Sequence, residues 1–182
     1  RRQMLFPADH PAYAGDCGIG PNPKLLARLK EADLVLAIGP RLGEMTTGGY
    51  TLLAAPRPAQ KLVHVHAGAE ELGRVYQGDL LINAGMPQIA AALAAMKPVD
   101  ATAWRAATQA ANADYREWTT RRENPGRVQM WDIVDFLRQR LPEDAILANG
   151  AGNFSGWFHR FYRHGRFRTQ LGPTNGSMGY GV

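Results

Sequence analysis

The sequence is poor in the features that mark secreted and membrane proteins. Its 182 residues contain one cysteine, Cys17, so no disulfide can form within the chain. A lone thiol is typical of a reducing compartment. No apolar run approaches the roughly 20 residues that a membrane helix needs. We therefore expect a cytoplasmic protein with no membrane partner. Cys17 lies in a loop with no base near it in sequence, which favours a structural thiol over a catalytic nucleophile.

Acidic residues are absent after Asp144, although the whole chain carries a net charge of +5. Four arginines fall in that stretch and supply most of the excess. They alternate with aromatic residues in WFHRFYRHGRFR (residues 157–168), a pattern that can bind nucleic acid by stacking and phosphate contact. The aromatic residues nevertheless share one helical face, with the arginines opposite, as in a helix that packs into a core. We therefore expect no nucleic-acid partner.

Short apolar runs alternate with helical patterns over the first hundred residues. The strands are predicted at 33–38, 61–66 and 80–84. The helices are predicted at 23–32, 70–76 and 87–96, the first with Asn22 as its N-cap and Pro23 in its first turn. Strands that alternate with helices require a parallel sheet with right-handed crossovers. The continuous apolar run of the first strand also predicts burial on both faces. The fold class is α/β.

A second α/β segment begins after a break in this pattern. A long polar helix is predicted over 102–122, with an aromatic stripe that packs on its neighbours. The later elements are a helix at 129–141, a strand at 145–148, a helix at 153–163 and a short strand at 167–171. The strand at 145–148 is expected in a different sheet from the first three. The predicted division is a first domain at 1–97, a helical connector at 98–127 and a second domain at 128–182.

The carboxyl ends of parallel strands are where ligands bind in open α/β sheets. Gly39 and Arg41 follow the first strand, where glycine lets backbone approach a ligand and Arg41 can pair with a phosphate. A nucleotide crevice is one interpretation, and a plain Gly-Pro turn is the other. His64 and His66 alternate on the second strand, as metal ligands can. With no acid or cysteine beside them, packed or solvated histidines are favoured.

The most informative stretch is the glycine-rich GSMGYG at 176–181. Its glycines surround Met178, which indicates backbone threaded close to a flat or crowded group. The longer segment LGPTNGSMGYGV (171–182) resembles the start of the thiamine-diphosphate-binding domain of acetolactate synthase and its relatives. ADLVLAIGPRLGE (32–44) and LVHVHAGAEELGRVY (62–76) resemble two successive segments of that family's middle domain. HPAYAGDCGIG (10–20) resembles the segment before them, and the ordered set is more specific than any one member.

This resemblance implies a Rossmann-like middle domain with a parallel sheet, of the kind that binds NAD or FAD. The beginning of a thiamine-diphosphate-binding α/β domain follows it. By the match, Met178 holds the cofactor bent, and backbone at Gly176 and Met178 binds its aminopyrimidine edge. The turn that contains Gly150, Gly152 and Asn153 faces the diphosphate.

The implied chemistry is decarboxylation of a 2-keto acid such as pyruvate and transfer of the acyl-anion equivalent to a second carbonyl. The implied setting is branched-chain amino acid biosynthesis, in a homodimer or homotetramer with Mg²⁺. The family's catalytic glutamate and its Mg²⁺-binding segment are expected outside these residues. The match therefore assigns no catalytic or metal-binding residue here, and this piece alone is expected to be inactive.

Flavin binding is a separate question, because flavin-binding members favour acids near the positions of Gly43 and His66. Only Glu44 stands nearby in this sequence. FAD is therefore an open alternative in the middle domain. Sister decarboxylases and carboligases also stay open. The rival from another class is a non-catalytic nucleotide-binding or regulatory α/β domain.

Overall fold

The computed structural model describes residues 3–173 of the chain. Contacts divide the chain into two compact units. The sheet unit runs from Leu26 to Ala103, and the composite unit joins the residues up to Leu25 with those from Trp104 onward. The boundary falls inside helix α1 (Pro23–Glu31), which contributes residues to both units. The domain division at 1–97, 98–127 and 128–182 stays a prediction.

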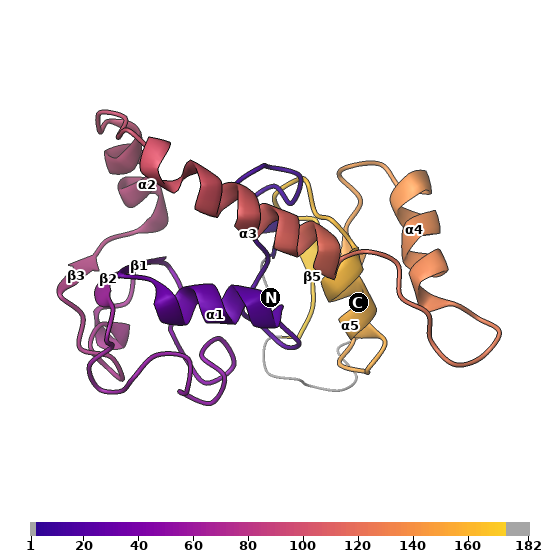
Figure 1. Ribbon diagram of the computed structural model, residues 1–182, viewed down its shortest axis with the longest axis horizontal. Helices are drawn as coiled ribbons and strands as arrows, with labels where there is room; N and C mark the ends of the chain where they lie inside the picture. Colours follow the sequence, from indigo (N-terminus) through magenta and orange to yellow (C-terminus); the bar gives the residue numbers. More distant parts are fainter. Residues whose placement is uncertain (1–2, 174–182) are drawn as a thin grey trace. The chain divides into compact units, whose positions relative to one another are not determined.

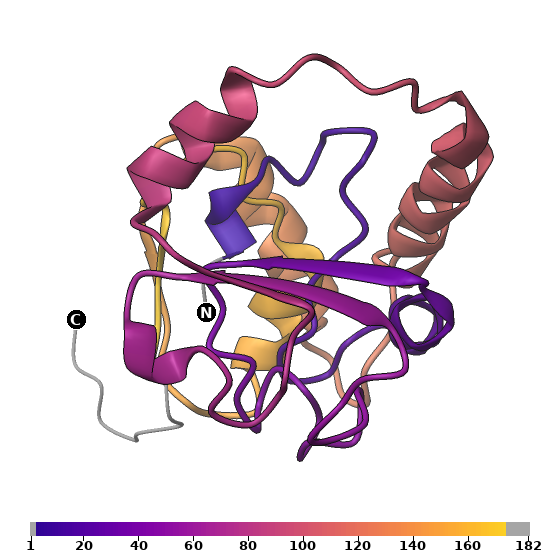
Figure 2. The same ribbon diagram turned by 90° about the vertical axis from the view of Figure 1, so that its left-hand side faces the viewer.

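Three parallel strands form the centre of the sheet unit. They are β1 (Leu34–Ile38), β2 (Lys61–His66) and β3 (Leu80–Asn83), in the order β1-β2-β3. Leu34 is in register with Lys61, and Val63 with Leu80. Figure 2 shows β1 and β2 side by side, and helix α2 (Met86–Ala94) follows β3. The three predicted strands and their parallel pairing are therefore confirmed.

The apolar cluster of this unit lies against one face of the sheet, and Val65 of β2 is buried on the other face. Leu62 of β2 is completely buried in this cluster, with Ala37, Leu42, Leu53 and Tyr76. Val35 packs against the same cluster. The other residues of β1 point away from it, because side chains alternate along a strand. Leu34, Leu36 and Ile38 are exposed, so burial on both faces of β1, which the apolar run predicted, is not observed.

The prediction of a helix at 70–76 is wrong. The structure has only a 3-10 helix, η2, at Ala69–Glu71. Leu72 already has extended backbone, and Gly73 has a φ of +74°. A left-handed residue at this place ends a right-handed helix. Gly73 in the sequence was therefore a signal that the helix ends there.

The composite unit contains the remaining elements (Figure 1). They are η1 (Gln3–Leu5), α3 (Arg105–Trp118), α4 (Met130–Arg140), β4 (Leu147–Ala148), α5 (Ser155–Phe161) and β5 (Gln170–Leu171). The 3-10 helix η3 (Thr102–Trp104) precedes α3 and contributes residues to both units. Strand β4 pairs in parallel with β5, in a sheet separate from β1–β3. The prediction that residues 145–148 lie in a different sheet is confirmed.

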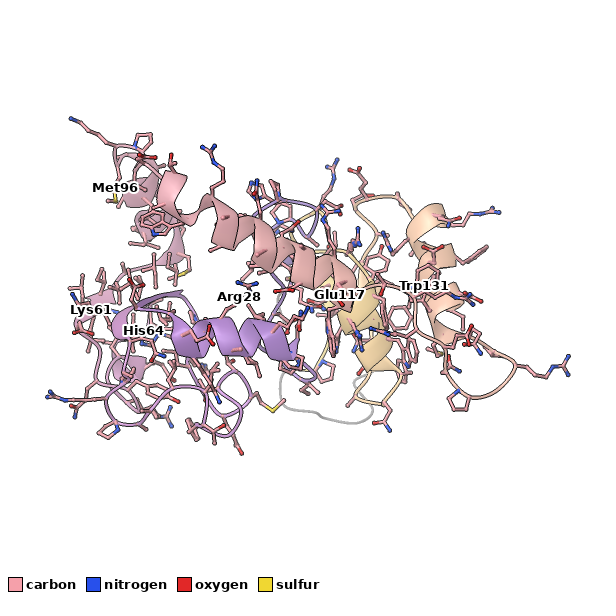
Figure 3. The ribbon with its side chains drawn as sticks, viewed as in Figure 1. Arg28, Lys61, His64, Met96, Glu117 and Trp131 are labelled. Atoms are coloured by element: carbon pink, nitrogen blue, oxygen red, sulfur yellow. The ribbon has the colours of Figure 1, made fainter. Side chains whose placement is uncertain are left out.

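The start of α1 is held by the side chain of Asn22. Its Oδ1 accepts a hydrogen bond from the Lys24 backbone N–H at 3.0 Å, which confirms the predicted N-cap. Its Nδ2 donates to the carbonyl of Asp114 in α3 at 3.1 Å. The Lys24 ammonium pairs with Asp114 at 3.0 Å and with Glu117, labelled on α3 in Figure 3, at 2.7 Å. These bonds attach the first turn of α1 to α3.

Helix α3 is shorter than predicted, and its aromatic stripe is only partly buried. Tyr115 is buried and meets Tyr13 edge to face, with ring centroids 4.8 Å apart. Asn112 donates a hydrogen bond to the carbonyl of Tyr13 at 2.8 Å. Trp104 is instead 58% exposed. Among the described residues, none of the helices combines the length and apolar character needed to cross a membrane.

Candidate functional site

Gly39 follows β1 at the carboxyl edge of the three-stranded sheet. Its N–H donates to the carbonyl of Val65 in β2 at 2.8 Å, and its φ is +83°. A Cβ on this residue would lie 2.9 Å from the sulfur of Met86. The backbone conformation and the Met86 side chain are thus sufficient to explain the glycine. Its predicted role in ligand binding stays a prediction.

Arg41 has a protein partner at the same edge. Its Nε lies 3.7 Å from Oε1 of Glu71, a carboxylate that Arg74 also contacts at 3.2 Å. Glu71 is buried, whereas the Arg41 side chain is 77% exposed. A pair this exposed and this long contributes little to stability. A phosphate could therefore still reach Arg41, in competition with Glu71.

His64 and His66 both bind backbone groups near this edge. The Nε2 of His64, a buried residue labelled in Figure 3, lies 2.8 Å from the carbonyl oxygen of Pro40. The Nδ1 of His66 accepts from the N–H of Gly68 at 3.0 Å. Among residues 3–173 no three His, Cys, Asp or Glu side chains gather as a metal site would require. The contacts therefore fit packed histidines that close the strand ends.

The second predicted site is the turn after β4, and its backbone has free donors. The N–H of Asn149 pairs with Leu171 of β5, and the N–H of Ser155 pairs with Gly152. Between them, the N–H groups of residues 150–154 have no acceptor among the described residues. These N–H groups, which precede helix α5, carry partial positive charge and are free to donate to a ligand. Successive N–H groups of this kind bind phosphate and other anions.

Side chains fix the shape of this turn. A Cβ on Gly152 would lie 2.7 Å from the ring of Phe154, so this exposed side chain would have to move to accommodate a larger residue. Asn149 donates to the carbonyl of Gly150 at 2.8 Å, and its Oδ1 lies 3.3 Å from Nε2 of His159 in α5. Gly172, just past β5, approaches the Asn149 amide closely. Asn149 was missed in the sequence, although a polar residue that ends an apolar strand before glycine was a visible signal.

Asn153 lines a cavity of about 310 Å³ within the composite unit. The cavity lies between residues 13–22, the end of α3 and helix α5. Arg160 of α5 lines it and is not on a solvent face opposite the aromatics, as the sequence pattern predicted. Its guanidinium carbon lies 3.5 Å from the centroid of the Trp118 ring. This contact joins residues 42 positions apart, and no local pattern signals it.

Two other titratable residues of the composite unit, Cys17 and His164, have shifted pKa values. Burial and the neighbouring Asp16 raise the pKa of the Cys17 thiol to about 11, so the thiol stays protonated near neutral pH. Burial lowers the pKa of His164 to about 4, and its Nδ1 lies 3.1 Å from the hydroxyl of Thr169. Gly176 and Met178 lie outside the described residues.

Comparison with known families identifies the first half of the chain. The model of the thiamine pyrophosphate enzyme central domain matches residues 1–93. The chain belongs to the thiamine pyrophosphate enzyme family. A Rossmann-like α/β fold with a parallel sheet, as predicted, agrees with this membership. The match includes the carboxyl edge of β1–β3, with Gly39 and Arg41.

Several curated members of the thiamine pyrophosphate enzyme family resemble the chain over nearly all its length. The large subunit of acetolactate synthase from Corynebacterium glutamicum is 26% identical, over 97% of this chain and 29% of the relative. A probable chloroplastic acetolactate synthase 2 from Oryza sativa is 28% identical, over 97% of the chain and 28% of the relative. Sulfoacetaldehyde acetyltransferase from Alcaligenes xylosoxydans xylosoxydans is 32% identical, over 62% of the chain and 19% of the relative. The chain thus spans less than a third of these relatives.

Proposed function

We propose that the chain is part of an acetolactate synthase-like enzyme that decarboxylates a 2-keto acid and transfers its acyl group to a second carbonyl compound. Family membership supports thiamine diphosphate as the cofactor. The acetolactate synthases matched over 97% of the chain support the reaction class. The observation that carries the proposal is the row of free N–H groups at residues 150–154, directly after β4.

In this proposal the turn after β4 holds the diphosphate. The N–H groups of residues 150–154 donate to phosphate oxygens, and the Asn153 amide adds a side-chain donor. Gly150 and Gly152 keep this backbone free of side chains, so that a phosphate can approach it. When bound, thiamine diphosphate supplies the carbon nucleophile that attacks a 2-keto acid and accepts the electrons left by decarboxylation. Mg²⁺ would be the companion cation, because it prefers oxygen ligands such as those of phosphates.

The proposal assigns two further positions to the cofactor. Met178 packs inside the bent cofactor, because a thioether side chain is apolar and adapts its shape to a ligand. Backbone at Gly176 and Met178 binds the aminopyrimidine edge. The whole enzyme is proposed to act as a homodimer or homotetramer.

The proposal is tested on the whole protein that contains this chain. With thiamine diphosphate and Mg²⁺ it should release CO₂ from pyruvate and form 2-acetolactate, and omission of the cofactor should abolish both. Sulfoacetaldehyde is the comparison substrate, since one relative is named sulfoacetaldehyde acetyltransferase. Absence of cofactor-dependent CO₂ release from pyruvate and other 2-keto acids would contradict the proposal.

The second candidate function is nucleotide binding at the carboxyl edge of β1–β3, as a flavin site or a regulatory site. The exposed Arg41 guanidinium at the end of β1 favours it. Titration with FAD and with ADP distinguishes the two functions. A nucleotide site predicts binding that Arg41→Gln weakens, whether or not the protein turns over pyruvate.

A further inference from the structure

The cavity in the composite unit has flat apolar walls. Tyr13 and Tyr115 meet edge to face on one side, with ring centroids 4.8 Å apart. On α5 the rings of Trp157 and Phe161 are stacked, with centroids 5.3 Å apart and planes 29° apart. The volume of about 310 Å³ is at the lower end of the roughly 300–1,000 Å³ of small-molecule sites. This arrangement suits a small flat molecule and is too small for a whole dinucleotide.

Two arginines with no carboxylate partner line the same cavity. The Arg160 guanidinium stacks on the Trp118 ring and donates through Nε to the Trp118 carbonyl at 2.8 Å. Within residues 3–173 neither Arg160 nor Arg122 forms an ion pair, and both line the cavity. Burial and the nearby Arg122 lower the pKa of Arg160. The cavity therefore has positive charge that a ligand could compensate.

The acidic side chain of the cavity is already occupied. Oδ1 of Asp16 accepts from the Gly18 N–H at 2.7 Å, and Oδ2 accepts from the Gln3 side chain. Asp16 keeps its negative charge, which contributes to the raised pKa of Tyr13, but among the described residues it forms no ion pair with Arg160 or Arg122.

Two buried phenols add unpaired hydrogen-bond donors. Tyr13 and Tyr115 are 9% and 7% exposed, and neither hydroxyl has a partner among the described residues. Burial raises the pKa of both phenols, which keeps them protonated as O–H donors. Their hydroxyl oxygens are not among the buried unpaired side-chain atoms of the described residues, unlike that of Tyr76, so both are accessible to a ligand in the cavity.

We propose that this cavity binds a small aromatic carboxylate. The ring lies between the aromatic walls, and the carboxylate accepts hydrogen bonds from Arg160 and from the Tyr115 hydroxyl, away from the negative charge of Asp16 beside Tyr13. A charge-assisted bond to a guanidinium is stronger than a neutral one. The uncompensated arginines therefore select an anion over a neutral ring of the same shape. Asn153 belongs both to the wall of this cavity and to the turn proposed for the diphosphate, so binding is tested without thiamine diphosphate.

The test is calorimetric titration of the whole protein that contains this chain, without thiamine diphosphate, with 2-naphthoate, 2-naphthamide and cyclohexanecarboxylate. Naphthoate should bind at least about tenfold more tightly than the other two, because only it has both the flat ring and the charge. Arg160→Gln should weaken naphthoate binding about tenfold. Arg127→Gln removes the same charge from an exposed residue outside the cavity and should change the affinity less than about twofold.

Tyr115→Phe keeps the ring and removes one hydroxyl, so it should weaken naphthoate binding several-fold while circular dichroism stays unchanged. Equal affinity for naphthoate and naphthamide in the unaltered protein would overturn the proposal without any variant. An equal loss of naphthoate affinity in Arg160→Gln and Arg127→Gln would overturn the proposal as well. Binding of FMN in the cavity, with no binding of naphthoate, would replace it with a flavin site.

Discussion

The imidazole of His64 and the carbonyl of Pro40 are joined by a 2.8 Å contact from Nε2 to oxygen. His64 lies in β2, and Pro40 lies just past the end of β1, so the contact fixes the loop that leaves β1. His64 is 2% exposed, which means that water cannot replace the bond easily. A hydrogen bond from a buried side chain therefore joins β2 to the loop after β1 at the carboxyl edge of the sheet.

Replacement of His64 by Phe should destabilise the fold by about 1–3 kcal/mol, because the Pro40 carbonyl then loses its buried partner. His66→Phe is the matched control, since His66 is only half-buried and bonds with Gly68 two residues away. His66→Phe should lower the free energy of unfolding clearly less than His64→Phe does. Urea unfolding followed by circular dichroism gives both values. Equal costs would show that the His64 contact adds nothing beyond packing.

Gly39→Ala should destabilise the chain by about 1–2 kcal/mol, the cost of a left-handed conformation for a residue with a Cβ. The φ of Gly39 is +83°, and the new methyl group would also press on Met86. Gly43→Ala is the control in the same loop, since nothing lies within 4 Å of its Cβ position. It should change the unfolding free energy by less than about 0.5 kcal/mol.

The double variant Gly39→Ala/Met86→Ala separates the two causes. If strain at φ dominates, removal of the Met86 side chain does not restore the stability that Gly39→Ala removes, after the cost of Met86→Ala alone is subtracted. Recovery in the double variant would assign the cost to the contact with the sulfur.

The sheet was predictable because its strands carry strong local signals. The run before Gly39 and the KLVHVH segment are short, apolar and bounded by glycine or proline, and β1–β3 formed where these patterns lie. The prediction of a helix after β2 was wrong because Gly73 adopts a left-handed conformation, which ends a helix even where the spacing of apolar residues favours one. Local periodicity thus fixed the strands and left the connections uncertain.

The candidate sites were less predictable than the fold. The turn at Gly150 and Asn153 was assigned from the resemblance to the family, and its free N–H groups depend on the actual backbone angles. The stacking of Arg160 on Trp118 depends on tertiary packing alone. Aromatic spacing in the sequence indicated a core, and the structure has a cavity between some of the same residues.

Cys17 should react slowly with iodoacetamide, because the thiolate is the reactive form. Burial and Asp16 raise its pKa from 9.0 to about 11, which lowers the thiolate fraction at pH 8 about a hundredfold relative to an unperturbed thiol. The rate should keep rising with pH up to about 11, where an unperturbed thiol has already reached its plateau. Asp16→Asn removes the nearby charge and should shift this profile to lower pH. A plateau below pH 9 in the unaltered chain would contradict the raised pKa.

Asn153→Asp tests whether the turn after β4 holds a diphosphate. The substitution keeps the size of the side chain and places a negative charge beside the free N–H groups of residues 150–154. A carboxylate a few ångströms from a diphosphate repels it by about 1–3 kcal/mol at the effective dielectric constant of a protein surface. The dissociation constant of thiamine diphosphate in the whole protein with Mg²⁺ should therefore rise roughly tenfold to a hundredfold.

Gln109→Glu makes the same change of charge on the exposed surface of α3 and controls for the overall charge of the protein. Its effect on cofactor affinity should stay below about twofold, because solvent and salt screen an exposed charge. Titration by calorimetry gives both constants, and circular dichroism verifies that both variants fold. If Asn153→Asp weakened thiamine diphosphate no more than Gln109→Glu, the diphosphate would lie elsewhere. The free N–H groups would then be ordinary solvated backbone.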